Sequence, residues 1–331
     1  MKILKIFSNK CLSLSYLGED WNNNLMQSII ESGRTISYVE TLSPSKTDKF
    51  HLSIKESDKK LFMREFELVA RFAIAKLNLK KVKIAFDTTE DLTWIKRDHN
   101  LRPSVYHHKL LCWNYLNVSI VEPYFIPLMS VPYTMLDNLD NLVIDLLNYI
   151  KTLSISVGLI LFDRGFYHAH LIDYLNNSKG DESWPYLILV PENKKVKEYI
   201  GRTNSFNFFH HEFKYNKDKS SWKPSTTIIV RRIDEKSCWC YATNQKPSLL
   251  LVKEYKKRWN IETGFRIHDE ARIKSKSKNL KIRFFYHLLG MLLVILWRLQ
   301  NKIKHYVFKR YLKFAEYQFY PKEIKELLVP P

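Results

Sequence analysis

The sequence has 331 residues, enough for one large folded domain or about two to three smaller ones. Hydrophobic residues make up 45% of the chain and aromatic residues 14%, which excludes an intrinsically disordered protein. The chain carries 53 Lys and Arg against 34 Asp and Glu, a net charge of +19 that favours a polyanionic partner, most often nucleic acid. A basic surface without a partner and attraction to anionic lipid are the alternatives.

Cysteine usage and hydropathy give further expectations. Of the four cysteines only Cys238 and Cys240 are close in sequence, and no second pair completes a zinc site, so reduced thiols in a reducing compartment fit best. The apolar stretch in MKILKIFSNK is too short for a secretory signal. The longest apolar run, from Phe284 to Trp297, contains His287 and is shorter than the roughly 18 to 20 residues that a membrane span requires. We therefore predict a buried core helix there.

The predicted elements begin with an amphipathic helix over 57–77, where apolar residues recur at helical spacing. The stretch KVKIAFDTTED, from Lys81 to Asp91, alternates and then runs apolar into Asp87, which predicts a strand with an acid near its carboxyl end. Two more strands, near 110–121 and 124–132, are expected to form an antiparallel hairpin.

A helix over 136–153 then leads to a short buried strand, VGLILF at 157–162, which ends at Asp163. Such strands belong to α/β sheets covered on both faces, where ligands gather at the carboxyl ends of the strands. Asp163 is therefore a candidate site residue, although many strand-end Asp residues only cap a helix or a turn.

The remainder of the chain predicts a further α/β unit, a β-rich segment and two long helices. The expected elements are a helix over 169–176, a strand over 186–190, antiparallel strands within 204–243, a helix from Pro247 to Arg272 and a hydrophobic helix from Phe284 to about 303. We expect these regions: a mainly helical N-terminal region (1–80), an α/β core (81–203 and 245–310), a β-rich insertion (204–244) and a C-terminal tail (311–331).

This order of elements matches a ribonuclease H-like fold, an α/β class with a mixed sheet flanked by helices and, here, a β-ribbon insertion before the last functional helix. In that arrangement the first and fourth strands lie side by side, which would bring Asp87 and Asp163 together. Two neighbouring carboxylates can hold Mg²⁺, which takes oxygen ligands and is often shared with substrate phosphates.

A third acid lies in the helix that follows the β-rich segment. The stretch YKKRWNIE places Tyr255, Arg258 and Glu262 three and four residues apart, on one face of a helix. Together with AFDTTE around Asp87 and LFDRGFY around Asp163, it resembles the DDE transposases of insertion sequences, and more narrowly the group marked by a Tyr-Arg-Glu-Lys signature. The resemblance covers about Lys81 to Leu299.

The resemblance implies a function for these residues. Asp87, Asp163 and Glu262 would be the catalytic residues and would bind two Mg²⁺ or Mn²⁺ ions, which stabilise the attacking and leaving oxygens at phosphorus. Water would cleave the phosphodiester at the end of the element, and the freed 3′-hydroxyl would attack target DNA. The partners would be the terminal repeats, the target DNA and a second copy of the chain, in the nucleoid of a prokaryotic cytoplasm. The N-terminal region would serve DNA binding or be truncated.

Basic and aromatic residues around the third acid are the expected DNA contacts. In the family, Tyr255 and Arg258 would lie near the cleaved phosphate, where an Arg fork suits bidentate binding. The position of the signature Lys is occupied by Asp269, so Arg266 or Arg272 would supply the missing charge. Six cations just past this helix are either DNA-backbone contacts or a solvated connector: Arg272, Lys274, Lys276, Lys278, Lys281 and Arg283.

Trp239, in the β-rich segment, either stacks on a base or belongs to the core. Two alternatives to an active transposase stay open. One is an inactive remnant that still binds DNA, which Asp269 and the indistinct N-terminal region favour. The other is a metal-dependent nuclease of the same fold that cuts DNA without joining it.

Overall fold

The computed structural model describes residues 2–12, 44–96, 98, 101–105, 107, 109–177, 183–213, 223–235, 237–272, 275, 277–303 and 307–318. The α-helices are α1 (Lys2–Leu12), α4 (Pro44–Glu56), α5 (Lys59–Leu77), α6 (Leu139–Lys151), α7 (Ala169–Asn176), α8 (Lys194–Gly201), α9 (Leu249–Glu254), α10 (Trp259–Ala271), α11 (Leu280–Asn301) and α12 (Phe308–Tyr317). The strands are β1 (Lys81–Thr93), β2 (Arg102–Pro103), β3 (Leu111–Glu122), β4 (Ile126–Tyr133), β5 (Ser156–Phe162), β6 (Tyr186–Leu189), β7 (Phe206–Glu212), β8 (Ser225–Arg232) and β9 (Cys238–Thr243). Two short 3₁₀ turns, η2 (Arg164–Phe166) and η3 (Tyr255–Arg258), complete the set.

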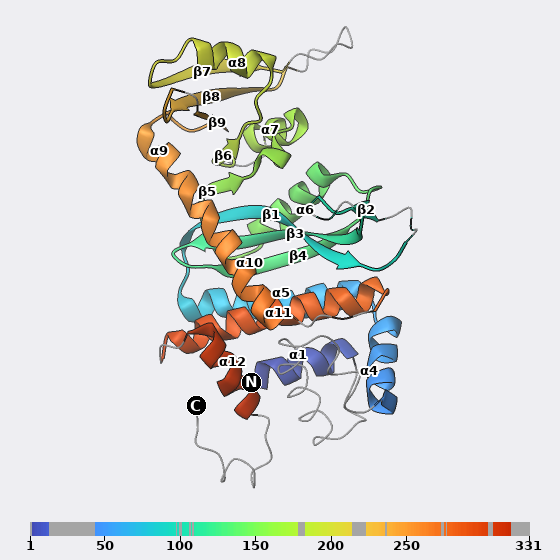
Figure 1. The fold of residues 1–331 in the computed structure, drawn as a ribbon. Helices are drawn as coiled ribbons and strands as arrows, with labels where there is room; N and C mark the ends of the chain where they lie inside the picture. Colours follow the sequence, from blue (N-terminus) through green and yellow to red (C-terminus); the bar gives the residue numbers. More distant parts are fainter. Residues whose placement is uncertain are drawn as a thin grey trace.

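One mixed sheet organises these elements (Figure 1). Its strands run in the order β2-β3-β1-β5-β6-β9-β8-β7, and β4 also pairs with β3. The pairings β1–β5 and β5–β6 are parallel, whereas β1–β3, β3–β4, β6–β9, β8–β9 and β7–β8 are antiparallel. The predicted fold class is confirmed, including the hairpin β3–β4 and the side-by-side placement of β1 and β5. The β-rich segment continues this same sheet beyond β6.

Helices cover the sheet on its β3–β4 side (Figure 1), where α5 and α11 pack against each other and against β4. The predicted amphipathic helix over 57–77 is α5. Asp58 caps its N-terminus by accepting a hydrogen bond from the Lys60 N–H, and Asn78 ends it in the left-handed conformation at φ 53°. Phe62, Phe66 and Ala70 are fully buried on its inner face, so this helix anchors the covering layer.

The hydrophobic helix α11 is buried, as predicted. It extends from Leu280 to Asn301, and by length and composition it is sufficient to cross a membrane, but 89% of its apolar window is buried inside the protein. The rings of Phe284 and Phe285 are fully buried. Phe284 stacks on Tyr115 of β3 with ring centroids 5.9 Å apart, so the helix forms the centre of the core beneath the sheet.

Two features of the elements differ from the sequence-based expectation. The short helix α8 was not expected, because its Lys-rich sequence lacks a long apolar period; Asn193 caps it by accepting from the Val196 N–H. The single long helix from Pro247 to Arg272 is instead divided into α9, η3 and α10. In a 3₁₀ turn, residues three apart point the same way, so η3 directs Tyr255 and Arg258 to one side.

Candidate active site

Asp87 and Asp163 are level with each other at the centre of the sheet. Strands β1 and β5 are parallel, their last paired residues are Ala85 and Leu161, and Asp87 and Asp163 each follow that pair by two residues. Asp163 comes directly after β5, as predicted, but Asp87 is within β1, which continues to Thr93 because it stays paired with β3. Asp163 caps η2 by accepting a hydrogen bond from the Arg164 N–H at 2.8 Å. The predicted capping role and the predicted site role thus coexist at Asp163.

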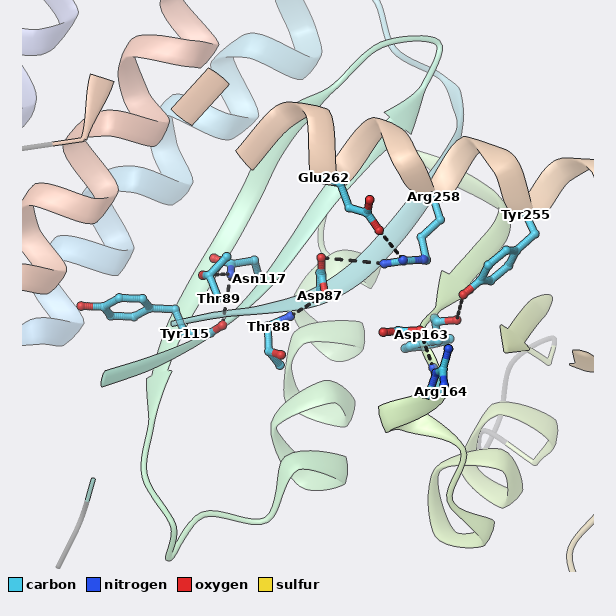
Figure 2. A network of polar contacts seen from close by, with 11 residues as sticks. Asp87, Thr88, Thr89, Tyr115, Asn117, Asp163, Arg164, Tyr255, Arg258 and Glu262 are labelled. Atoms are coloured by element: carbon cyan, nitrogen blue, oxygen red, sulfur yellow. Dashed lines mark hydrogen bonds and ion pairs between the residues drawn. The ribbon is translucent and has the colours of Figure 1, made fainter. Parts of the chain in front are cut away.

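The third acid, Glu262, is on α10, which crosses the sheet above Asp87 and Asp163 (Figure 2). Two contacts fix the crossing. The Asn260 side-chain amide donates to the Val121 carbonyl at 3.0 Å, and Gly264 lies against the Phe125 ring. A Cβ at Gly264 would be 2.4 Å from that ring, so only glycine lets the helix approach this closely. Glu262 therefore reaches the site because Gly264 is small.

An ion-pair cluster ties the start of this region to the sheet. Lys83 of β1 and Lys257 of η3 each pair with both Glu122 of β3 and Glu254 of α9, with Lys83–Glu122 and Lys257–Glu254 at 2.9 Å. Four alternating charges in contact form a network, which stabilises more than an isolated surface pair does. The cluster holds η3 against β1 and β3, one residue before Arg258.

Asp87, Asp163 and Glu262 line one cavity of about 490 Å³. Burial of Asp87 raises its pKa to about 6, Arg258 and a hydrogen bond from the Thr88 N–H lower it, and the charges of Asp163 and Glu262 raise it further. A carboxyl group with a raised pKa in a cavity, beside two other acids, is typical of a functional site. The three predicted catalytic residues are thus brought together.

Arg258 stands between two of these acids (Figure 2). Its Nη2 lies 2.5 Å from Glu262 Oε1, and its Nη1 lies 3.8 Å from Asp87 Oδ2. Burial opposes the charge on this guanidinium, but the neighbouring Tyr255, Asp87 and Asp163 raise the pKa of Arg258 above its ordinary value. Arg258 therefore stays charged and partly balances the acidic cluster.

The donor set at this site fits Mg²⁺ or Mn²⁺. The three side chains offer carboxylate oxygens, the ligands that these hard cations prefer, and they come from a strand, a strand end and a helix that meet at one cavity. The raised pKa of Asp87 shows that Arg258 alone does not compensate its burial. Within the described part of the chain, no group of three His, Cys, Asp or Glu side chains is already gathered closely enough to hold a metal ion.

Tyr255 supports the end of β5 from above. Its side chain is 6% exposed, and its hydroxyl donates a hydrogen bond to the Phe162 carbonyl at 3.1 Å, one residue before Asp163. The Arg258 guanidinium lies 5.7 Å from the Tyr255 ring centroid. The signature tyrosine thus positions both a catalytic candidate and its counter-ion.

A second cavity, of about 830 Å³, adjoins the first. Asp163 lines both, and Arg258 lines the second. Two exposed tryptophans face this space: Trp239 of β9, 38% exposed, and Trp259, 62% exposed. Trp239 is therefore not a core residue. Trp259 was not predicted as a site residue. The sequence does place this large aromatic side chain directly after Arg258 and outside the apolar face of its helix, which could have indicated it.

The basic residues beyond Glu262 are distributed unevenly. Arg272 lines the cavity that holds the three acids, and its Nε lies 3.4 Å from Asp269 Oδ1. Arg266 is exposed on α10, outside the residues that line the cavity, and Lys278 is exposed on the connector. Lys274 and Lys276 lie outside the described residues. Of the two candidates to replace the signature Lys, Arg272 is the one that faces the acids' cavity.

A buried polar network behind β1 was also not predicted. His287 of α11 is 1% exposed, and its Nε2 lies 3.1 Å from Ser130 Oγ and 3.2 Å from Asn117 Oδ1. Asn117 is paired with Asp87 across β1–β3 and donates to the Thr89 hydroxyl at 2.8 Å. His268 of α10 donates to the His287 carbonyl at 3.0 Å. This network links the helix that carries Glu262 to the strand that carries Asp87.

Comparisons with known proteins give a matching family model and a similar fold. Residues 140–297 match the family model described as Transposase DDE domain, a segment that contains Asp163 and Glu262. The fold is similar to the piggyBac transposase in a structure titled "Cryo-EM structure of piggyBac transposase synaptic complex with hairpin DNA", with a TM-score of 0.60 and 13% sequence identity over 95% of this chain and 73% of that chain. At that identity the likeness is one of fold. No curated protein sequence matches the chain.

Proposed function

We propose that this chain is a DNA transposase that cleaves phosphodiester bonds at the ends of a mobile element and joins them to target DNA. The observation that carries the proposal is the convergence of Asp87, Asp163 and Glu262 on one cavity of a ribonuclease H-like fold. The match of residues 140–297 to a transposase DDE domain supports it. The net charge of +19 supports a DNA partner.

In this function the chain's own residues hold and orient the reacting groups. Asp87, Asp163 and Glu262 supply the oxygen ligands for Mg²⁺ or Mn²⁺, which when bound lowers the pKa of water and stabilises charge at phosphorus. Arg258 presents a planar fork toward the phosphate, and Tyr255 keeps the Asp163 end of β5 in place. Water is the first nucleophile, and the freed 3′-hydroxyl is the second.

The second cavity is the proposed path of the DNA end. Trp239 and Trp259 offer stacking surfaces, and Lys256 adds positive charge beside them. The structurally similar piggyBac transposase is described in a synaptic complex with hairpin DNA, which favours paired ends and a dimer for this chain as well. Terminal repeats and target DNA are the two proposed substrates, and the nucleoid of a prokaryotic cytoplasm is the proposed location.

Membership of the Tyr-Arg-Glu-Lys group is part of the proposal. Tyr255, Arg258 and Glu262 match the first three signature positions, and Asp269 departs from the fourth. Because Arg272 faces the same cavity and pairs with Asp269, we propose that the Arg272 guanidinium takes the place of the signature Lys.

A joining assay tests this function. A labelled duplex carrying the sequences that flank the coding region is incubated with the protein, a supercoiled plasmid and Mg²⁺ or Mn²⁺. Label that enters the plasmid supports a transposase. Nicked but unjoined duplex indicates a nuclease of the same fold, and binding without cleavage indicates a DNA-binding remnant. Lys256→Gln, Trp239→Ala and Arg272→Gln then test the proposed DNA contacts. A variant that loses a phosphate contact should weaken binding more at low salt than at high salt, because its affinity depends less steeply on salt than that of the wild type. A variant that loses only a stacking contact should weaken binding about equally at both salt concentrations.

A further inference from the structure

The N–H donors of the Arg258 guanidinium do not all have hydrogen-bond partners among the described residues. The Arg258 side chain is 10% exposed, and its Nη1 and Nη2 face Asp87 and Glu262. Its Nε is buried, and among the described residues this atom has no hydrogen-bond partner. A guanidinium has five N–H donors in a fixed fork, and a buried donor without a partner is costly. The site therefore holds Arg258 by one hydrogen-bonded ion pair with Glu262 and a longer contact to Asp87, and leaves its Nε without a partner among the described residues.

The position of Arg258 relative to the two cavities gives it an alternative partner. Asp87 and Glu262 line the cavity of the acids, whereas Arg258 lines the larger cavity with Lys256 and Trp259. Asp163 lines both cavities, so a phosphate in the larger cavity would meet the Arg258 fork away from Asp87 and Glu262. Bidentate Arg–phosphate pairs are among the strongest hydrogen-bonded ion pairs, so phosphate would compete with the contacts of Arg258 to Asp87 at 3.8 Å and to Glu262 at 2.5 Å.

The Arg258 side chain can move while its backbone stays in place. Arg258 is the last residue of η3, at the point where the 3₁₀ turn becomes α10. The ion-pair cluster around Lys257 holds η3, and the contacts of Gly264 and Asn260 hold α10. Rotation about the side-chain bonds of Arg258 would therefore turn the guanidinium away from Asp87 while Glu262 stays in place.

We propose that Arg258 is an exchangeable counter-ion that makes cation binding at the three acids depend on DNA. Without DNA, the guanidinium neutralises Asp87 and Glu262 and competes with a divalent cation. A DNA phosphate in the larger cavity draws Arg258 away and leaves the carboxylates free for the cation. By linkage, the cation strengthens DNA binding by the same factor. This inference rests on the proposed function, because it requires both a cation and a DNA phosphate at this site.

Mn²⁺ binding, followed by electron paramagnetic resonance of the full-length protein, tests the exchange without any cleavage reaction. Each protein is titrated with Mn²⁺ alone and with a saturating blunt DNA duplex, and the titration of that duplex alone is subtracted. For the wild type we expect DNA to tighten Mn²⁺ binding by about 10-fold or more, within the usual range of coupling between sites. Arg258→Gln should bind Mn²⁺ about 10-fold more tightly than wild type without DNA, and DNA should change its affinity less than about threefold.

Matched variants separate the exchange from other effects. Lys253→Gln removes an exposed positive charge of α9 from a residue that lines neither cavity, and should keep both the Mn²⁺ affinity and the coupling. Arg258→Lys keeps the charge without the fork and should keep the competition but weaken the coupling. Circular dichroism confirms that each variant is folded.

The outcomes distinguish this inference from the function on which it rests. If Asp163→Asn abolishes Mn²⁺ binding but Arg258→Gln binds Mn²⁺ no more tightly than wild type, the exchange is wrong and the metal site stands. If DNA tightens Mn²⁺ binding equally in Arg258→Gln and wild type, the exchange is also wrong. If neither the wild type nor any variant binds Mn²⁺, with or without DNA, both the exchange and the proposed metal-dependent function are overturned.

Discussion

The rings of Phe86 and Phe162 stack with their centroids 5.1 Å apart and their planes at 14°. Both rings are fully buried, and each directly precedes one of the two acids Asp87 and Asp163. The stack therefore holds β1 and the end of β5 level with each other where the two acids follow. The packing of Phe86 against Phe162 thus fixes the relative position of Asp87 and Asp163.

Truncation of this stack is expected to be costly. Phe162→Ala should lower the free energy of unfolding by about 3–5 kcal/mol, whereas Phe162→Leu, which keeps most of the volume, should cost less than about 1.5 kcal/mol. Urea unfolding followed by tryptophan fluorescence measures both. Equal stability of Phe162→Ala and wild type would show that the stack does not support the strand ends.

Asp87→Asn is expected to stabilise the protein at neutral pH. Burial raises the pKa of Asp87 to about 6, so between pH 3.8 and 6 the folded chain retains a proton that the unfolded chain has released. The free energy of unfolding therefore falls as the pH rises through this window, by up to about 3 kcal/mol. Loss of the Asp87–Arg258 pairing makes the net gain in the variant smaller.

Urea unfolding with EDTA, at pH 5 and at pH 7.5, measures this effect. Asp87→Asn should exceed the wild type in stability at pH 7.5, and the difference should shrink at pH 5. The control is Glu90→Gln: Glu90 lines the same cavity but accepts hydrogen bonds from the Ser104 hydroxyl and the Val105 N–H, and its loss should destabilise the protein. An Asp87→Asn protein that is less stable than wild type at pH 7.5 contradicts the account.

The buried histidines predict a pH dependence of the opposite sign. Burial lowers the pKa of His268 to about 4, and it lowers that of His287 well below its ordinary value of 6.5. Below pH 6.5 the unfolded chain takes up protons that the folded chain refuses, so the free energy of unfolding falls as the pH falls from 6.5 toward 4.

This acid destabilisation is best measured in an Asp87→Asn background, which removes the opposing titration of Asp87. In that background, His287→Asn should cost about 1–3 kcal/mol at pH 7.5, because Ser130 and Asn117 lose their partner, and should flatten the slope between pH 6.5 and 5. Thermal unfolding at three pH values gives the slope. An unchanged slope would show that another group titrates.

Gly264→Ala is expected to impair the site more than its size suggests. The added Cβ would lie 2.4 Å from the Phe125 ring, so either the ring or α10 must move. We expect a destabilisation of about 1–3 kcal/mol and a displacement of Glu262 that weakens Mn²⁺ binding. Gly165→Ala, with open space around its Cβ position, is the matched control and should leave both properties close to wild type. Retention of full Mn²⁺ affinity by Gly264→Ala would show that the close approach is not needed.

The sequence predicted that Asp87, Asp163 and Glu262 lie at one site, because the strand or helix that carries each acid has a clear local periodicity. The apolar run into Asp163 defines a strand end, the alternation into Asp87 defines a strand, and the spacing of Tyr255, Arg258 and Glu262 defines a face. The extension of β1 past Asp87 to Thr93 was not predicted, because it depends on pairing with β3. The order of elements then determined which strands are neighbours. These features need only local patterns and topology rules, and the structure agrees with them.

The remaining features depend on tertiary contacts that no local period records. His287 lies within an apolar helix, and only the approach of Ser130 and Asn117 from two strands makes it part of a polar network. The break of the long helix at η3 accompanies the bond from Tyr255 to the end of β5, a partner 93 residues away in sequence. The helical period alone does not say whether Trp259 faces the core or solvent. In the structure it is exposed beside the larger cavity.

The most direct test of metal-dependent cleavage at this site is a comparison of wild type and Asp163→Asn on a labelled duplex that carries the sequences flanking the coding region. Cleavage is followed with Mg²⁺ or Mn²⁺, and DNA binding is measured in parallel. The account predicts that the wild type cuts the duplex and that Asp163→Asn binds it equally but cuts at least about 10³-fold more slowly, since several kcal/mol of charge stabilisation are lost. Equal cleavage by both proteins, or binding without cleavage by the wild type, would contradict it.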